Sequence, residues 1–145
     1  NALNEMIKYC QYDWISLIDV DDKWLPKKLE SQIPHMDNYD IIGTRCHYFG
    51  DRNDQPSIPL GDLKKHNFTN VNPIINSSCL IKKELAVWDK EYDGVEDYDL
   101  WLKLWKQGKQ FYNVESIEVM HRIHRESAFN AKGNHLKVND LLKKI

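Results

Sequence analysis

Three acids follow an apolar run near the start of the chain. Residues 14–18 are typical of a strand buried on both faces, and Asp19, Asp21 and Asp22 come directly after it. In open α/β sheets the ligand crevice lies beyond the carboxyl ends of such strands. Clustered carboxylates repel one another unless a cation lies between them, and oxygen ligands suit Mg²⁺ or Mn²⁺ holding a phosphorylated substrate. The alternative, a helix cap, explains one or two acids but not three. We therefore predict a metal–phosphate site.

A second pair of acids opens a predicted helix over residues 96–107. On a helical wheel at about 100° per residue, Glu96 and Asp99 fall on the polar side with Lys103, whereas Asp97 falls among the apolar residues. A carboxylate directed inward at a helix N-terminus is stabilised by the helix dipole, yet burial keeps it basic. Asp97 is therefore a candidate general base. The alternative is that Asp97 is the N-cap of this helix.

A third group of reactive side chains occupies the segment from His121 to Ser127. On a strand, Arg122 and His124 point to one face, while His121 and Ile123 point to the other. Arg122 and His124 could therefore share a site, with a cation for phosphate and an imidazole for a metal. The alternative is a pair of ordinary surface or hydrogen-bonded residues.

The composition bounds the class of protein. The chain has 145 residues, of which 41% are hydrophobic, and a formal net charge of −2. This length corresponds to one domain, and the charge balance gives no footprint for nucleic acid. Three scattered cysteines without a CxxC motif favour reduced thiols in a cytosolic protein. Because no apolar run approaches the roughly 20 residues of a membrane span, we expect no transmembrane segment.

Strand and helix patterns alternate along the chain, and residues 57–72, which have no clear period, are predicted to be a loop. The pattern predicts helices at residues 2–11, from Pro26 onward, at 82–88 and at 96–107 with Gly108 as its end. It predicts strands at residues 13–19, 39–44 with an extension over 46–49, 74–81, 111–114 and 117–123. The helix from Pro26 should bury Leu25, Leu29 and Ile33. This order implies an α/β layer fold with a mixed sheet.

The tail carries one apolar stripe at helical spacing, formed by Val138, Leu141, Leu142 and Ile145. A terminal helix packed on its own domain is the usual meaning of such a stripe. A surface that docks a membrane or a partner chain is the alternative. Four apolar residues bury too little for firm membrane anchoring, since even a single acyl chain is marginal. We therefore expect intramolecular packing.

The three reactive groups, in this order, resemble glycosyltransferase family 2, whose members have the GT-A fold. The similarity runs from Asn1 to about Ser127. Its motifs are DVDD at 19–22, WLPKKLE at 24–30, NSSCLI at 76–81, EDYDLW at 96–101, and RIH at 122–124 followed by Ser127. A DxD motif alone is weak, but this series at these separations is specific. The chain is therefore similar to a GT-A-like, three-layer α/β domain.

The resemblance implies a metal-dependent, inverting transferase of the hexosyltransferase type, which moves a sugar from a nucleotide-sugar donor to an acceptor hydroxyl with Mn²⁺ or Mg²⁺ as cofactor. The implied base is Asp97, the position that the helical wheel also selects. The other implied roles are metal binding by Asp21 and His124, donor binding by Asp19 (near the ribose), Asp22 and Arg122, and acceptor binding by Glu96 and Trp101.

The partners that the resemblance implies are a UDP-sugar as donor and a glycan or lipid-linked acceptor. It places the protein in polysaccharide biosynthesis, in the cytoplasm or peripheral to a membrane. No nucleic-acid partner is expected.

The sequence departs from the family pattern at its start. Members normally open with a Pro-x-Tyr-Asn stretch and an early Asp that together grip the nucleotide base, and neither stands in this chain. We therefore expect a partial GT-A domain over residues 1–145, with residues 128–145 as a tail helix and the N-terminal nucleotide-binding part missing or supplied by another polypeptide. Strands without neighbours would leave a sheet edge open to self-association.

Two other functions compete with this interpretation. A haloacid-dehalogenase-like phosphatase would use Asp19 as nucleophile in the DxD motif, but Lys23 stands where that motif expects Thr or Val. A non-catalytic nucleotide- or carbohydrate-binding fragment would bind ligands without turnover. In that case, replacing Asp97 would change nothing measurable.

Overall fold

The computed structural model describes residues 2–127 and 131–145, so the first three residues of the predicted tail, 128–130, lie outside the described part. The α-helices are α1 (Ala2–Ile7), α2 (Lys28–Gln32), α3 (Glu96–Lys106) and α4 (Asn134–Lys143). The 3₁₀ turns are η1 (Ile33–His35), η2 (Asn76–Ser78), η3 (Lys83–Leu85) and η4 (Lys90–Tyr92). The strands are β1 (Trp14–Ser16), β2 (Lys23–Trp24), β3 (Ile41–Gly50), β4 (Gly61–Asp62), β5 (Leu80–Lys82) and β6 (Phe111–Ile123).

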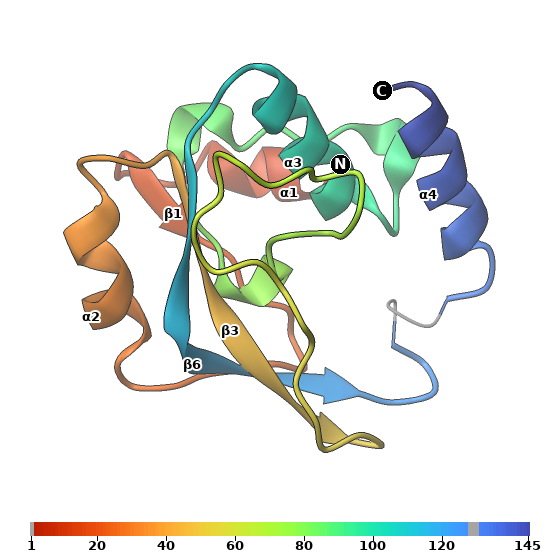
Figure 1. Ribbon diagram of the computed structural model, residues 1–145, viewed down its shortest axis with the longest axis horizontal. Helices are drawn as coiled ribbons and strands as arrows, with labels where there is room; N and C mark the ends of the chain where they lie inside the picture. Colours follow the sequence, from red (N-terminus) through yellow and green to blue (C-terminus); the bar gives the residue numbers. More distant parts are fainter. Residues whose placement is uncertain (1, 128–130) are drawn as a thin grey trace.

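The strands form one mixed sheet, as the sequence predicts. Their order is β1-β5-β3-β6-β2, with β4 paired to β6. The long strands β3 and β6 run parallel at its centre (Figure 1), while the other pairings are antiparallel. Each long strand was expected as two shorter ones. The register instead shifts between Thr44 and Cys46, so the break in the sequence pattern is an irregularity inside a continuous strand.

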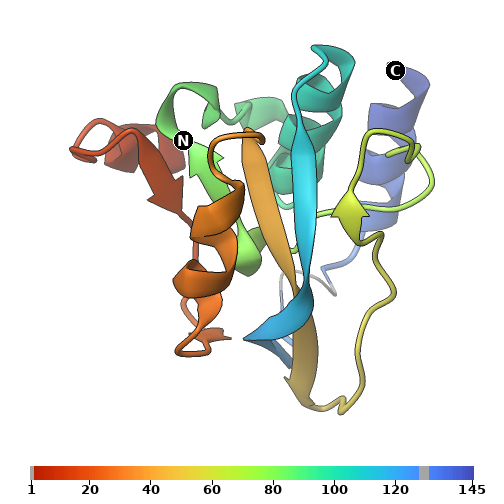
Figure 2. The ribbon, with the colours of Figure 1, turned by 60° about the vertical axis from the view of Figure 1, so that its left-hand side comes forward.

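The sheet is covered on both faces, which gives the three layers expected of a GT-A-like fold. Successive strand residues point to opposite faces. Ile41 and Ile81 join the main core, which also contains residues of α3, α4 and the segment 86–95. Ile42 and Leu80 instead belong to a second cluster, against which Met36 and Tyr39, just after η1, are packed. Figure 2 shows α2 on one side of β3 and β6, with α3 and α4 on the other.

The predicted buried side of the helix from Pro26 is wrong. Leu29 is 42% exposed and Ile33 is 56% exposed, whereas Lys28 and Gln32 are fully buried. A polar pattern therefore faces the sheet. Because buried polar groups cost free energy unless they are hydrogen-bonded, this arrangement needs partners on the strands.

Those partners are present. The Gln32 amide donates to the carbonyl oxygens of Ile42 (2.7 Å) and Ser78 (2.8 Å), and so ties α2 to β3 and η2. The Lys28 ammonium donates to Ser16 Oγ at 2.8 Å and to Gln32 Oε1 at 2.9 Å. It also lies 4.5 Å from the ring centroid of Trp24. Burial lowers the pKa of Lys28 to about 8.

The remaining boundaries differ from the sequence prediction at short, ambiguous runs. The helix predicted at 2–11 ends at Ile7, and the strand predicted at 13–19 shortens to β1. The apolar segment 74–81 is a strand only in its last two residues, Leu80 and Ile81. It also contains η2, in which Ser77 and Ser78 are buried. The segment 82–88 forms a 3₁₀ turn rather than an α-helix, because so short a run does not repay helix nucleation.

The tail helix packs on its own domain. Leu141 is 4% exposed within the main core, and Val138 and Leu142 pack against that core. Lys144 donates to Tyr92 Oη at 2.6 Å and fixes the C-terminal turn of α4 to η4. The intramolecular packing expected for this helix is therefore confirmed. Among the described residues, none of the helices has the length and apolar character needed to cross a membrane.

Candidate active site

A cavity of about 760 Å³ collects the three reactive groups that the sequence singled out. Its walls come from the turn after β1, from η2, from the start of α3, from the end of β6 and from α4. The reactive side chains that line it are Asp19, Asp21, Glu96, Asp97, His121 and Arg122. Segments about 100 residues apart in the sequence therefore meet at one site.

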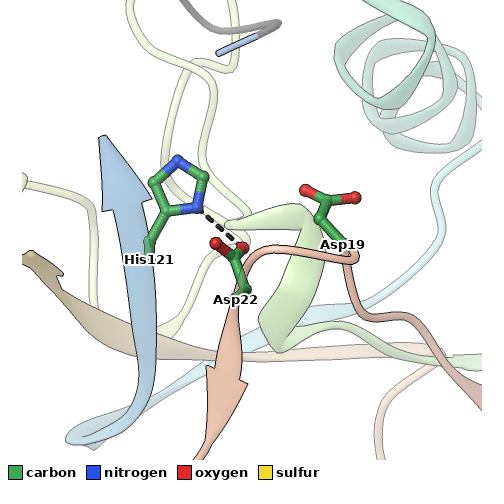
Figure 3. A group of neighbouring side chains, drawn as sticks. All are labelled: Asp19, Asp22 and His121. Atoms are coloured by element: carbon green, nitrogen blue, oxygen red, sulfur yellow. Dashed lines mark hydrogen bonds and ion pairs between the residues drawn. The ribbon is translucent and has the colours of Figure 1, made fainter. Parts of the chain in front are cut away.

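The carboxylate of Asp22 lies beneath this cavity and is sealed. Its Oδ1 accepts a hydrogen bond from the backbone N–H of Arg122 at 2.9 Å. Its Oδ2 is 2.5 Å from Ser77 Oγ, which donates to it, and 2.7 Å from His121 Nδ1 (Figure 3). Ser77 Oγ in turn accepts from the N–H of Asp19 at 3.0 Å. This network fastens the DVDD turn to β6 and η2.

The electrostatics of this sealed pair follow from its hydrogen bonds. Burial alone would raise the pKa of Asp22, but the donors from His121, Ser77 and Arg122 lower it below its usual value. Burial alone would likewise lower the pKa of His121, yet the Asp22 carboxylate raises it. Each partner therefore favours the charged form of the other. Because the Asp22 side chain has no exposed surface, the direct contact with the donor expected for it is not available.

The second pair, Asp21 and His124, is open to solvent. His124 Nε2 lies 2.9 Å from Asp21 Oδ2, and the two side chains are 39% and 33% exposed respectively. The hydroxyl of Ser127 accepts from the N–H of His124 at 3.0 Å and holds the end of this segment. The contact between the two side chains is a hydrogen bond. Neighbouring ligands of an octahedral ion at about 2.1 Å lie about 3.0 Å apart, so the same two atoms could also be ligands of one divalent cation.

Another group also has atoms that could ligate a metal. The carboxylates of Asp19 and Asp22 and a ring nitrogen of His121 lie within 4.8 Å of one another (Figure 3). However, both oxygens of Asp22 already accept hydrogen bonds from the protein. Burial and the nearby charge of Asp22 raise the pKa of Asp19. Asp21 and His124 are the other pair of side chains that could hold a divalent cation.

Arg122 lies on the cavity wall in a defined position. Its guanidinium carbon is 4.4 Å from the ring centroid of Phe49, and its Nε donates to the carbonyl oxygen of Asp21 at 3.3 Å. An aromatic platform of this kind orients an arginine while leaving its terminal donors directed elsewhere. A planar guanidinium so placed can bind phosphate oxygens.

Asp97 is the second residue of α3 and lines the cavity. The N-cap is Val95, so the alternative in which Asp97 is the cap is wrong. Asn72 Nδ2 donates to Asp97 Oδ2 at 3.2 Å. Burial raises the pKa of Asp97 to about 6, against the hydrogen bonds from Tyr98 N–H and Asn72 that lower it. A carboxylate with this pKa is basic enough to accept a proton near neutral pH.

The other predicted residues of α3 divide between the cavity and the core. Glu96 lines the cavity, and its carboxylate accepts from the N–H of Gly94. Trp101 is fully buried and meets Phe111 edge-to-face, so the acceptor contact expected for it is wrong. Asp99, placed on the polar side by the helical wheel, is also buried and forms an ion pair with Lys103 at 2.6 Å.

Several cavity residues were missed by sequence reasoning. The C-terminal helix contributes Asn134, His135 and Val138 to the wall. Asn72 precedes a proline in a segment with no periodic pattern, so no local signal marked it. The polar run Asn76–Ser78 was noticed only as part of a family motif, although a hydroxyl of this run supports the DVDD turn.

The mixed sheet covered on both faces is consistent with a GT-A-like fold, and the acidic cavity lies at the ends of β1 and β6. The glycosyl transferase family 2 profile matches residues 1–86, which is more than half of the chain. The chain therefore belongs to glycosyl transferase family 2. This membership sets aside the dehalogenase-like phosphatase interpretation.

Curated relatives agree with the family assignment. An uncharacterized glycosyltransferase of Haemophilus influenzae is 30% identical over 84% of this chain and 49% of its own length. The O-antigen biosynthesis glycosyltransferase WbnJ of Escherichia coli is 27% identical over 87% of this chain and 54% of its own length. The Escherichia coli enzyme named UDP-Glc:alpha-D-GlcNAc-diphosphoundecaprenol beta-1,3-glucosyltransferase WfaP is 24% identical over 99% of this chain and 59% of its own length. The chain spans about half the length of these relatives.

Proposed function

We propose that this chain carries the catalytic base and the diphosphate-binding side of a metal-dependent, inverting glycosyltransferase. The observation that carries the proposal is that Asp97, with its raised pKa, lines the same cavity as Asp21 and Arg122. A base and a diphosphate site that share one cavity are what transfer between a nucleotide-sugar and a hydroxyl requires.

In the proposed reaction, the Asp97 carboxylate accepts the proton of the acceptor hydroxyl. The acceptor oxygen then forms a bond to the anomeric carbon on the face opposite the leaving group. The bond from that carbon to the phosphate oxygen breaks, and its electron pair leaves with the nucleoside diphosphate. Attack from the opposite face inverts the anomeric centre. Arg122 is placed to bind the negative charge that develops on the departing phosphate.

Asp21 and His124 would hold the divalent cation, Mn²⁺ or Mg²⁺, because their ligand atoms have the spacing of neighbouring ligands. When bound, this cation neutralises the leaving diphosphate. Asp19, next to this pair on the cavity wall, is proposed to contact the ribose. Asp22 lies beneath the cavity and holds the turn that carries Asp19 and Asp21.

For the substrates, we propose a UDP-sugar donor and a glycan or lipid-linked acceptor in polysaccharide biosynthesis. The names of two relatives support this choice, since one refers to O-antigen biosynthesis and the other to a UDP-glucose donor and a diphosphoundecaprenol acceptor. Glu96, at the start of α3, remains the candidate acceptor contact on the cavity wall.

The proposal is tested by replacing the base in the full-length protein. We expect Asp97→Asn to lower transfer by roughly 10²–10⁴-fold, the usual contribution of a general base, while donor binding measured by calorimetry stays intact. Glu96→Gln is the matched control and should have the milder effect. Activity of the native enzyme should fall as the pH drops below about 6, because Asp97 is then protonated.

A reversed ranking of these two variants would overturn the assignment of the base. If nucleotide binds but Asp97→Asn leaves every measurable property unchanged, the chain is a non-catalytic binding fragment instead.

A further inference from the structure

The loop between β4 and η2 is tied to the core although its sequence has no periodic pattern. Leu63 and Phe68 of this loop are each 1% exposed, and the Tyr98 hydroxyl of α3 donates to the carbonyl oxygen of Phe68 at 2.7 Å. The amide of Asn113, buried in β6, donates to the carbonyl oxygen of Pro73 at 2.8 Å. The loop therefore approaches the cavity in a fixed position.

Pro73 is buried. The residue before a proline is restricted in its backbone dihedral angles. That residue, Asn72, lies on the cavity wall with its side chain against the start of α3. Its Nδ2 donates to Asp97 Oδ2 at 3.2 Å. The contact joins two segments that are 25 residues apart and brings a neutral donor to the proposed base.

We propose that Asn72 is a positioning residue for Asp97: its amide holds Oδ2 and so fixes the direction in which the carboxylate can receive the proton of the acceptor hydroxyl. This inference rests on the proposed function, and it adds a residue to that same site. A carboxylate held by such a donor keeps a fixed direction, and proton transfer needs that direction to be right to within a fraction of an ångström.

The rest of the Asn72 amide supports this role. Its Oδ1 is buried and has no hydrogen-bond partner within the described ranges 2–127 and 131–145. An unpaired buried oxygen costs free energy, so asparagine is not the residue that packing alone would favour here. Reversing the amide would place this oxygen against the Asp97 carboxylate, where the two would repel each other. The carboxylate therefore fixes the orientation of the amide.

The charged surroundings of Asp97 explain why a neutral donor matters. Glu96 on the same helix and Asp19 on the DVDD turn both oppose ionisation of Asp97, and burial opposes it most. Asn72 acts in the other direction. The further titratable groups around this cavity are Cys79 on the buried side, Asp21, Tyr48, His121 and Arg122 on the wall, Tyr98 of α3 and His135 of α4.

The test compares Asn72→Leu, which is similar in size but has no donor, with Asn70→Ala at an exposed position of the same loop. In the full-length enzyme with a UDP-sugar and Mn²⁺, Asn72→Leu should lower kcat by roughly 10- to 100-fold, the range for a lost hydrogen bond to a charged group. The KM for the donor should not change. The acidic limb of the kcat–pH profile should move above its position near pH 6, because the charged carboxylate has lost a donor.

Asn70→Ala should match the native enzyme in both measurements. Asn72→Gln, which retains an amide donor, should recover part of the lost kcat and should return the acidic limb toward the native pH. Asn72→Ser provides a second, smaller replacement if Asn72→Leu does not fold. The melting temperature of each variant is measured in parallel.

An unchanged kcat and pH profile in Asn72→Leu would overturn the inference. Equal losses of kcat in Asn72→Leu and Asn70→Ala would also overturn it. So would weaker donor binding together with a lower melting temperature in every Asn72 variant, because these results indicate a loop that only needs its native packing. The proposed function fails separately, by an active Asp97→Asn variant. If Asp97→Asn is inactive while Asn72→Leu behaves as the native enzyme, only the inference about Asn72 fails.

Discussion

Two Asp–His pairs join the same two segments of the molecule and differ in almost every other respect. Asp22 with His121 and Asp21 with His124 both connect the turn after β1 to the end of β6, at 2.7 Å and 2.9 Å. We call the first pair sealed because the Asp22 side chain has no exposed surface, although His121 is 18% exposed and lines the cavity. About one third of each side chain in the second pair is exposed.

The difference shows how adjacent acids in one motif take on different tasks. Asp22 accepts hydrogen bonds from Ser77 and from the Arg122 N–H as well as its contact with His121, so three of its roughly four lone-pair sites are used within the protein. A carboxylate that is buried among such partners fixes a turn but is not accessible to a ligand. The Asp21 carboxylate is partly exposed and therefore accessible. The sealed pair therefore positions the open pair.

The largest effect on this comparison should come from Asp22→Ala. This change leaves the Ser77 hydroxyl, the Arg122 N–H and the His121 ring without their shared acceptor. We expect a loss of about 3–5 kcal/mol in the free energy of unfolding, the usual cost of breaking a buried pair. Chemical denaturation measures it, with the exposed Asp37→Ala as control, which should stay within about 0.5 kcal/mol of native. A near-native stability for Asp22→Ala would show that the sealed pair does not hold the turn.

Asp21→Ala should have the opposite profile. We expect the melting temperature to stay near native, because the side chain is exposed to solvent. The Mn²⁺-dependent affinity for a nucleoside diphosphate should fall by about 100-fold or more, since even groups that only support a metal ligand contribute about 10–100-fold. Calorimetric titration with Mn²⁺ and with a chelator measures this difference. If the native protein binds the nucleoside diphosphate equally well with Mn²⁺ and with the chelator, then Asp21 and His124 do not hold a metal ion.

The smallest effect concerns Lys28, which lies under Trp24, whose indole N–H donates to the carbonyl oxygen of Ser77 at 2.7 Å. The pKa of Lys28 is about 8 in the folded protein and 10.5 in the unfolded chain. Between these values the unfolded state binds more protons, so stability should rise with pH. Between pH 8 and 10.5 we expect the free energy of unfolding, measured by chemical denaturation, to rise by on the order of 2 kcal/mol. This rise should be absent in Lys28→Met and retained in the exposed control Lys27→Met. Identical pH profiles for all three proteins would contradict a lowered pKa.

The sequence predicted the parts of this fold where a strong periodic pattern coincides with the final environment. The helix over 96–107 is one residue longer than α3, and the inward placement of Asp97 on it is confirmed. The two central strands were located, although each was expected in two pieces. Short apolar runs such as 74–81 and 82–88 were assigned wrongly, because few residues carry little periodic signal.

The sequence also brought the three reactive groups to attention, since acids after a buried strand, an acid on the apolar side of a helix, and an Arg-x-His segment are all local features. Local order alone determined that these groups belong near the ends of their elements. Local order could not predict which acid of a group is buried by the protein and which remains accessible to a ligand. Nothing in the spacing of Asp21 and Asp22 tells which one meets the backbone of β6.

Tertiary structure decided those rankings, because they depend on partners far along the chain. Asp22 is sealed by residues 55 and about 100 positions away, and Asn72 reaches Asp97 across 25 positions. Lys28 and Gln32 are buried, against their polarity, because carbonyl and hydroxyl groups of β1, β3 and η2 complete their hydrogen bonds. Polarity in the sequence measures the cost of burial, whereas the fold alone supplies the partners that offset it.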